Sequence, residues 1–262
     1  MTYQFLETEF QQGLASIWLN RPERRNAMND TLIAELTQAV AQAIDDPAVR
    51  VLMIGGRGKV FCAGADLNWM GGARDKPADE VRKDSGGLAG VMRMLHDCRK
   101  PTVARVHGSA FAGGMGLMSA CDISIASTEA SFCLSEVKLG LIPAMISPYV
   151  LKRMGEAHGR RYFLTAEVFA AAEAYRIGLV SEIAQPDVFD AKVDDILSHL
   201  LLGGPNAMAE CKQLIHDISG RVIDDEVTAD TAARIARLRV SDEAREGIAA
   251  FFEKRKPNWV GE

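Results

Sequence analysis

The chain has 262 residues, which is long enough to bury a sizeable core in one large domain or in one domain with an appendage. Hydrophobic residues make up 48% and charged residues 25%, a balance that excludes a disordered or low-complexity chain. The formal net charge of -5 disfavours general binding to nucleic acid, so no nucleic-acid partner is expected.

Neither a membrane segment nor a metal site is apparent in the sequence. The longest stretch without Asp, Glu, Lys or Arg, residues 106–121, contains four glycines and is too short to span a bilayer. No basic region followed by an apolar run opens the chain, which favours a cytoplasmic location over export. The five cysteines match no zinc or redox spacing, so we expect reduced and mostly buried thiols.

Short apolar and β-branched runs predict strands in the first part of the chain, at residues 14–19, 49–54, 102–106, 123–126 and 131–133. Between them, apolar residues recur at helical spacing. The predicted helices cover residues 30–44, a segment that ends at about Cys98, and a short apolar segment that ends at about Ala120. Asn29 or Asp30 is the expected N-cap of the first helix. This alternation predicts a mixed α/β core.

Beyond Pro143 the pattern predicts helices alone, over residues 148–154, 160–164, 170–176, 188–202, 207–218, 228–239 and 243–255. Gly203, Gly204 and Pro205 form the clearest hinge signal. We therefore divide the chain into an α/β core, residues 1–200, and a helical region, residues 201–262. The last helices are amphipathic, and they are expected to pack on the core or on a neighbouring subunit.

Two glycine-bearing loops are the candidates for chemistry. Residues 59–67 follow a buried strand, and their small side chains would let backbone amides approach a ligand. Residues 107–116 leave another strand and enter a helix, where free amides favour negative charge. Together the loops could aim two amides at one oxygen, as an oxyanion hole does, or both could be structural turns. Neither loop matches a phosphate or dinucleotide fingerprint, so no nucleotide cofactor is expected.

Four segments carry a resemblance to a known family. The segment VARVHGSAFAGGMGLMSACDI, residues 103–123, resembles the signature region of the enoyl-CoA hydratase/isomerase (crotonase) superfamily. LNRPERRNAMN, FCAGADL and the C-terminal FFEKRKPNW resemble other characteristic stretches, in the right order. The resemblance implies an α/β fold with a β-β-α spiral core and a C-terminal helical trimerisation region. It also implies a homotrimer, or a homohexamer made of two trimers.

The same resemblance implies an acyl-CoA thioester as the substrate, with CoA as part of that substrate and no separate cofactor. By position in the motifs, the backbone amides of Ala65 and Gly113 would hold the enolate. The residues that would contact CoA are Arg25, Ala27, Ala63, Ala65, Asp66, Leu67, Asn68 and Gly113, together with Lys254 at a neighbouring subunit. Solvated surface charge is the alternative for Arg25 and Lys254, and capping of the following helix is the favoured role of Asp66.

Hydratases of this family commonly use two glutamates, and this chain retains one of the two positions. The first position is Gly116, which has no side chain, and the second is Glu136. Glu136 is therefore the acid/base candidate, with an ordinary glutamate of a first helical turn as the alternative. Its apolar flanks predict a partly buried carboxyl with a raised pKa. For His107, a structural role is favoured over that of a base.

The acyl group is predicted from residues 140–150. Most family members have a glycine-rich stretch after the proline there, whereas this chain has Ala144 to Tyr149. Together with RRYFLTAEVFAAAEAYRIGLVSEI, residues 160–183, and with Gly116, this segment resembles bacterial methylglutaconyl-CoA hydratases and the related isohexenylglutaconyl-CoA hydratases. Such substrates carry a second carboxylate, which needs a donor. The candidate donors, which the sequence does not rank, are Arg105, Lys138, Lys152 and Arg153.

The leading hypothesis is a hydratase of a branched glutaconyl-CoA, such as 3-methylglutaconyl-CoA of leucine degradation, with Glu136 as the acid/base. One alternative is an enoyl-CoA double-bond isomerase that uses Glu136 alone. Others are an isohexenylglutaconyl-CoA hydratase and a non-catalytic acyl-CoA-binding oligomer. The last is disfavoured because Glu136 and both loops are present.

Overall fold

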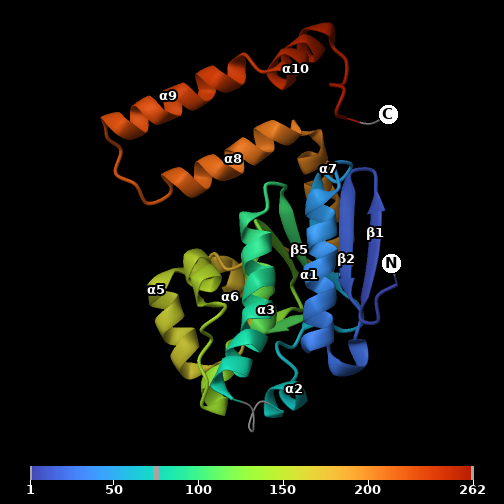
Figure 1. Cartoon of the computed structure of the whole chain (residues 1–262), viewed down its shortest axis with the longest axis vertical. Coiled ribbons are helices and arrows are strands. Elements are labelled where there is room, and N and C mark those ends of the chain that lie inside the picture. Colours follow the sequence, from blue (N-terminus) through green and yellow to red (C-terminus); the bar gives the residue numbers. More distant parts are fainter. Residues whose placement is uncertain (1, 73–76, 261–262) are drawn as a thin grey trace.

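The computed structural model describes residues 2–72 and 77–260, which form an α/β core with a helical extension at one end (Figure 1). Within these residues, one sheet has six strands in the order β1-β2-β3-β5-β7-β10 and another has four in the order β4-β6-β8-β9. The pairs β1–β2 and β8–β9 are antiparallel, and the other neighbours are parallel. The larger sheet consists of β1 (Leu6–Gln11), β2 (Leu14–Leu19), β3 (Val51–Gly56), β5 (Thr102–Val106), β7 (Ile123–Ser127) and β10 (Glu182–Ala184).

Alternating side chains along β3 cover both faces of the larger sheet. Leu52 and Ile54 belong to the main hydrophobic core, whereas Val51 and Met53 belong to a second cluster. The main core is shared with α1 (Asp30–Asp45) and α3 (Ala78–Asp97), and the second cluster with α7 (Phe189–Leu202). A parallel sheet buried on both faces needs apolar residues at every position, which explains the unbroken apolar runs.

Successive β-β-α units build the core. In each unit one strand joins the larger sheet, the next joins the smaller sheet, and helical segments follow. The units are β3, β4 (Val60–Cys62), α2 (Leu67–Gly71) and α3; β5, β6 (Ser109–Phe111) and α4 (Gly113–Ala120); β7, β8 (Ser131–Cys133), η2 (Glu136–Leu139) and α5 (Ser147–Thr165). This order confirms the predicted β-β-α spiral.

The helical extension stands away from the core. It consists of α8 (Pro205–Ile218), α9 (Asp225–Arg239) and α10 (Asp242–Glu253), and α9 and α10 lie beyond one end of the sheets (Figure 1). Many of its large apolar side chains stay exposed, namely Ile215, Val222, Ile223, Ile235, Val240, Ile248, Phe251 and Phe252. The core therefore leaves much of the extension uncovered.

The predicted elements are present, with small shifts at their ends. Asn29 is the N-cap of α1, as expected, and its side chain accepts from the Leu32 amide at 3.0 Å. The two helices predicted at 148–154 and 160–164 are one helix, α5, whose backbone is non-helical at Gly155.

The sequence prediction missed five strands. β1 is a largely exposed edge strand, so it lacks the apolar run of the buried strands. β4, β6, β9 (Phe169–Ala170) and β10 are two or three residues long, and β4 and β6 also lie inside the glycine-bearing segments that were assigned to loops. Because β9 and β10 follow Pro143, the prediction of helices alone in that part was wrong. The short 3-10 helix η1 (Pro22–Arg24) and α6 (Ala171–Arg176) complete the described elements.

The cysteines are free thiols, and four of the five are buried, as expected. Burial raises the pKa of Cys62 and of Cys121 to about 12, so both thiols stay protonated. Among the described helices, none combines the length and the apolar character that crossing a bilayer requires.

Candidate active site

The candidate site lies at one edge of the smaller sheet. β4, β6 and β8 are parallel neighbours, in which Cys62 pairs with Ala110 and Phe111 pairs with Cys133. The segments that leave the carboxyl ends of these strands therefore emerge side by side. Converging loops at the carboxyl edge of parallel strands are a common place for a ligand.

The two glycine-bearing loops touch through Gly64. This residue has φ +94°, and a Cβ added to it would lie 2.9 Å from the Cβ of Ala112 and 3.2 Å from the Gly113 nitrogen. A larger residue would have to push the loops apart and would be strained at this φ. The structure thus brings together the two segments that the sequence assigned to an oxyanion hole.

The backbone amides of Ala65 and Gly113 are open. In the described part of the chain, neither amide donates to an oxygen of the protein. Gly113 is the first residue of α4, where helices leave amides unpaired. Ala112 before it has φ 46° and ψ -120°, a strained backbone for a residue with a Cβ. The surroundings therefore enforce the turn that presents the Gly113 amide.

Residues 25–28 run alongside the first loop. The Ala63 amide donates to the Arg25 carbonyl at 3.0 Å, and the Met28 amide donates to the Gly64 carbonyl at 2.8 Å. These bonds tie together the two segments that the resemblance assigned to CoA. The Arg25 side chain is exposed.

The Arg21 side chain joins these two segments by hydrogen bonds. Its Nη1 donates to the Ala27 carbonyl at 2.9 Å and to Asp66 Oδ2 at 2.6 Å. The other Asp66 oxygen accepts from the amides of Asn68 and Trp69 at 2.9 and 3.4 Å, which confirms Asp66 as the N-cap of α2. The Arg21 hydrogen bond, with these amides, lowers the pKa of Asp66. The Asp66 carboxylate is thus ionised, and the positive charge of Arg21 balances its negative charge.

The buried Asn26 side chain holds residues 57–61, which lead into the first glycine-bearing loop, and the sequence analysis missed this role. Its buried Nδ2 donates to the carbonyls of Arg57, Val60 and Phe61 at 2.9, 2.8 and 3.1 Å. Its Oδ1 accepts from the Arg21 amide at 2.9 Å. Asn26 also has φ 55°, which asparagine tolerates better than most residues. Its position inside the RRNAM motif was the available signal.

Leu67 and Asn68 are exposed at the start of α2, where a bound ligand could reach them. Lys254 is not near them. It follows α10 on the helical extension, whereas α2 lies at the opposite end of the molecule (Figure 1). One chain therefore does not join Lys254 to these loops, and its contact with CoA on a neighbouring subunit stays a prediction.

Glu136 opens the 3-10 helix η2, three residues after β8 ends beside the second loop. The Ala112 amide donates to the Cys133 carbonyl at 2.8 Å, so the two segments are joined just before the site. Glu136 Oε2 is buried and meets no hydrogen-bond partner among the described residues. Desolvation by burial raises the pKa of the Glu136 carboxyl. An orphaned, desolvated carboxyl is suited to exchanging a proton with a ligand.

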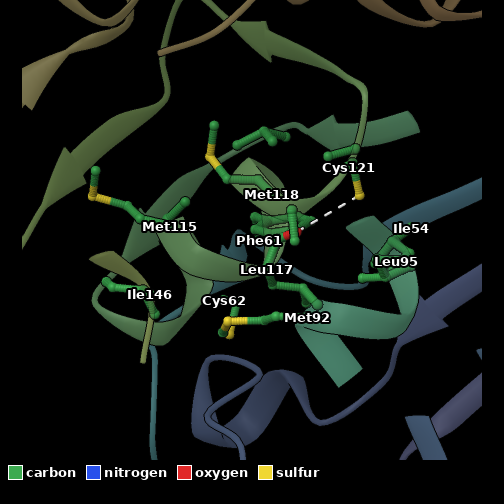
Figure 2. Packing of buried hydrophobic residues seen from close by; sticks show 14 of the residues in the cluster. Ile54, Phe61, Cys62, Met92, Leu95, Met115, Leu117, Met118, Cys121 and Ile146 are labelled. Carbon is green, nitrogen blue, oxygen red and sulfur yellow. Dashed lines mark hydrogen bonds between the residues drawn. The ribbon is translucent and has the colours of Figure 1, made fainter. Parts of the chain in front are cut away.

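Position 116, the place of the family's other glutamate, is closed by Ile146. A Cβ on Gly116 would lie 2.2 Å from Ile146 Cγ2, 2.6 Å from Ile146 Cβ and 2.7 Å from Met92 Cε. Figure 2 shows Ile146 and Met92 around α4, in the buried cluster. The sequence lacks a glutamate at position 116, and the packing leaves no room for one, because no side chain fits there while Ile146 stays in place.

Apolar side chains dominate the surface that follows Glu136. Leu139, Leu141, Ile142 and Met145 are exposed, as is Leu67 on α2. Exposed apolar side chains grouped beside a candidate site are typical of a surface that binds an apolar chain or another protein.

Two of the proposed carboxylate donors are engaged elsewhere. Arg105 Nε donates to Asp190 at 3.0 Å on the α7 side of the larger sheet, where its guanidinium also lies 4.8 Å from the Phe189 ring. Arg153 donates to the carbonyls of Ser119, Leu179, Cys121 and Asp122. Neither arginine is brought to Glu136.

The other two donors differ in position. Lys152 lines a hollow with His96 and Lys212, apart from the loops. Lys138 shares η2 with Glu136, and its Nζ donates to the Ala166 carbonyl at 2.7 Å. Lys138 is thus the candidate that the fold keeps near the site. His107 was expected to be structural, and its Nε2 lies 2.9 Å from the Gly58 carbonyl, on the side of Trp18 and Arg105.

Comparison with known proteins identifies the family. The family model described as enoyl-CoA hydratase/isomerase matches residues 9–262. A crystal structure of an enoyl-CoA hydratase from Shewanella pealeana is 42% identical, with a TM-score of 0.93, and the match covers 98% of this chain and 96% of that one.

Two further similarities support this assignment. AtuE of Pseudomonas aeruginosa is 35% identical with a TM-score of 0.92, over 98% of this chain and all of its own. The crotonyl-CoA hydratase of Syntrophomonas wolfei is 34% identical over 99% of both chains. The chain therefore belongs to the enoyl-CoA hydratase/isomerase family and is an enzyme of the crotonase fold.

Proposed function

We propose that the protein hydrates an enoyl-CoA thioester, with the amides of Ala65 and Gly113 as the oxyanion hole and Glu136 as the acid/base. The observation that carries this proposal is a buried carboxyl that has no hydrogen-bond partner in the described part of the chain and lies at the same sheet edge as two open amides. The name of the Syntrophomonas relative, a crotonyl-CoA hydratase, supports hydration.

In the proposed reaction, the thioester oxygen accepts hydrogen bonds from both amides. The Glu136 carboxylate takes a proton from water while the water oxygen bonds to C3. The C2–C3 π electrons then move toward the thioester, whose oxygen becomes the enolate that the amides stabilise. Glu136 returns its proton to C2, and the carbonyl forms again. One water is added, and the carboxylate is regenerated.

The closed position 116 implies that one carboxyl performs both proton transfers. A lone glutamate would equally serve a double-bond isomerase, by taking a proton from C2 of a 3-enoyl-CoA and returning it at C4. Isomerisation therefore remains the second candidate. Hydration is preferred because the similar protein of Syntrophomonas wolfei is named a hydratase.

For the acyl group, we propose a branched glutaconyl-CoA such as 3-methylglutaconyl-CoA. The resemblance of residues 140–150 and the loss of the first glutamate support it. The second carboxylate of such a substrate would meet Lys138, after Lys138 leaves the Ala166 carbonyl. Isohexenylglutaconyl-CoA is the longer alternative, and the exposed Leu139, Leu141 and Ile142 would suit its chain.

We further propose that the helical extension binds other copies of the chain, as a homotrimer or homohexamer. The exposed apolar residues of α8 to α10 support this assembly, since a lone chain leaves them in water. Sedimentation should therefore give three or six times the 28.5 kDa of one chain. A particle of one chain, at concentrations where activity is measured, contradicts the assembly.

Glu136→Gln should lower kcat about a thousandfold, because an amide neither takes the proton of water nor delivers one to carbon. The Kd for an acyl-CoA should change less than about threefold, since the loops stay intact. Steady-state kinetics and equilibrium titration measure the two quantities. Glu129→Gln, on the exposed turn before β8, is the matched control and should change neither. Wild-type turnover by Glu136→Gln would remove Glu136 from the mechanism.

The raised pKa of Glu136 is tested by the pH profile of the wild-type enzyme and by the stability of Glu136→Gln. As the pH falls through the pKa of Glu136, kcat/KM should fall because the carboxylate form is lost, and at a higher pH than for an exposed glutamate. A carboxyl with a raised folded pKa favours folding at low pH and loses that contribution as the pH rises through the folded pKa. Glu136→Gln should therefore gain thermal stability relative to wild type as the pH rises from below the ordinary glutamate pKa of about 4 through the raised folded pKa. If the difference in thermal midpoint between Glu136→Gln and wild type does not change with pH, the Glu136 carboxyl is not buried as described.

Gly116→Ala should lower the free energy of unfolding by about 1–3 kcal/mol, because its Cβ collides with Ile146. Ile146→Gly removes the two nearest of the three colliding atoms and leaves Met92 Cε, but it also opens a cavity, which costs about 2–5 kcal/mol. The double variant should be more stable than the sum of the two losses predicts. Gly90→Ala is the control, since its Cβ meets nothing within 4 Å. Additive losses in a denaturation series would show that Ile146 does not close position 116.

Mass spectrometry after incubation with 3-methylglutaconyl-CoA, crotonyl-CoA and a 3-enoyl-CoA tests the reaction and the acyl group. We expect one water to be gained, faster on the branched glutaconyl substrate. Lys138→Met should lower kcat/KM for that substrate about tenfold more than for crotonyl-CoA, which has no second carboxylate. An equal loss on both contradicts the role of Lys138. Unchanged mass with shifted retention of the 3-enoyl-CoA favours the isomerase.

A further inference from the structure

β4 contains one residue more than the part of β6 with which it pairs. Val60 pairs with Ser109, and Cys62 pairs with the next residue of β6. Phe61 is therefore an extra residue and forms a bulge in β4. A bulge interrupts the ladder of hydrogen bonds and turns the strand, and bulges are common beside active sites. The chain that leaves this bulge runs directly into the first glycine-bearing loop, so the bulge helps to set where that loop lies.

The Asn26 side chain binds this bulge. Its Nδ2 donates to the Val60 carbonyl at 2.8 Å and to the Phe61 carbonyl at 3.1 Å, which are successive groups at the irregular step. Asn26 is completely buried, and Gly56 leaves room for it, since a Cβ on Gly56 would lie 2.9 Å from Asn26 Nδ2. A buried amide that is shared between successive carbonyls holds them at one separation. Asn26 thereby fixes the shape of the bulge.

Two residues after Asn26, the backbone of Met28 fixes the direction of the Ala65 amide. The Met28 amide donates to the Gly64 carbonyl at 2.8 Å, and the Asp66 amide donates to the Met28 carbonyl at 2.8 Å. This is the pattern of a short parallel ladder, in which Met28 and Ala65 face each other. The residue in the middle of such a pattern turns its own amide away from the partner segment. The ladder therefore keeps the Ala65 amide free for a ligand.

The Met28 side chain reaches the second glycine-bearing loop. It is completely buried, and a Cβ added to Gly113 would lie 2.9 Å from Met28 Cε. The methyl group of Met28 therefore packs directly against Gly113, which carries the other open amide. One residue thus contacts both parts of the candidate oxyanion hole, through its backbone on one side and its side chain on the other.

We propose that Asn26 and Met28 are positioning residues that set the separation of the Ala65 and Gly113 amides. The inference rests on the proposed function, because this separation matters only if both amides meet one oxygen. Through the bulge, Asn26 sets where the first loop lies, and Met28 relates that position to Gly113. Both side chains are completely buried, so they act through the loops rather than on the substrate. A misplacement of about 1 Å in such a site can cost about a hundredfold in rate.

The affinities of two CoA derivatives test this inference without turnover. Butyryl-CoA has the thioester oxygen that the amides would hold, and the thioether S-butyl-CoA has the same chain length without that oxygen. Wild type should bind butyryl-CoA about tenfold more tightly, the effect of two neutral hydrogen bonds. Asn26→Gly removes the side chain without backbone strain, because Asn26 has φ 55°. This variant should lose most of the preference, and its Kd for S-butyl-CoA should change less than about threefold.

Steady-state kinetics on crotonyl-CoA give a second measurement. Asn26→Gly should lower kcat about a hundredfold, as the loss of one oxyanion donor does, with a change in KM of less than about threefold. Asn29→Ala is the matched control, because it removes the N-cap of α1 from the same segment. It should lower the thermal midpoint and leave both the preference for the thioester and kcat unchanged.

Met28→Leu is the milder second variant, since it nearly conserves the side-chain volume and should stay folded. It keeps the backbone bonds of Met28 and changes only the contact with Gly113, so the preference for butyryl-CoA should fall about threefold. If the variants at both positions keep the wild-type preference, this inference alone is wrong. Equal weakening of both CoA derivatives by Asn26→Gly would show a general loss of structure and would also overturn it. If wild type itself does not prefer the thioester, the proposed oxyanion hole fails, and the inference fails with it.

Discussion

The close contact of Gly64 with Ala112 and Gly113 is the constraint on which the site depends. At 2.9 Å from a neighbouring Cβ, position 64 has no room for a side chain, and its φ of +94° favours glycine as well. This contact holds the ends of β4 and β6 together, so two amides from different β-β-α units open at one place. β8 adds Glu136 at the same edge. Each unit of the spiral thus supplies one part of the site, and the smaller sheet sets their spacing.

Polar groups inside the fold hold this arrangement. Asn26 donates to the carbonyls of Arg57, Val60 and Phe61, and Arg21 joins the Ala27 carbonyl to the Asp66 carboxylate. The amides of Ala65 and Gly113 remain open because other groups supply the bonds of their loops. Rigidity of this kind matters to catalysis, since an amide that is already aimed needs no reorganisation when charge develops.

The sequence predicted the parts of the fold that depend on continuous apolar runs and on motifs. β2 and β5 were located to the residue because each is a mostly buried run of five or six residues, and the three-residue β8 was located as well. β4 and β6 were assigned to loops, since each is a three-residue strand inside a glycine-bearing segment, and yet they belong to the sheet that carries the site. Glu136, Ala65 and Gly113 were named from motif position. The closure of position 116 was not predictable, because Ile146 is thirty residues away and meets Gly116 only through the packing of α4 and α5.

With a single carboxyl at this site, the net charge of the site stays at one negative charge throughout the proposed reaction. Glu136 carries one negative charge at the start, and it becomes neutral as it takes the proton of water, while the enolate oxygen becomes negative. The charge therefore moves from the carboxylate to the amides without a second anion nearby, and Arg21 already neutralises Asp66. A second carboxylate at 116 would add repulsion in a poorly solvated place, where it is least screened. Ile146 fills that place with apolar packing, and Glu136, desolvated by its own burial, is the one carboxyl left to accept a proton.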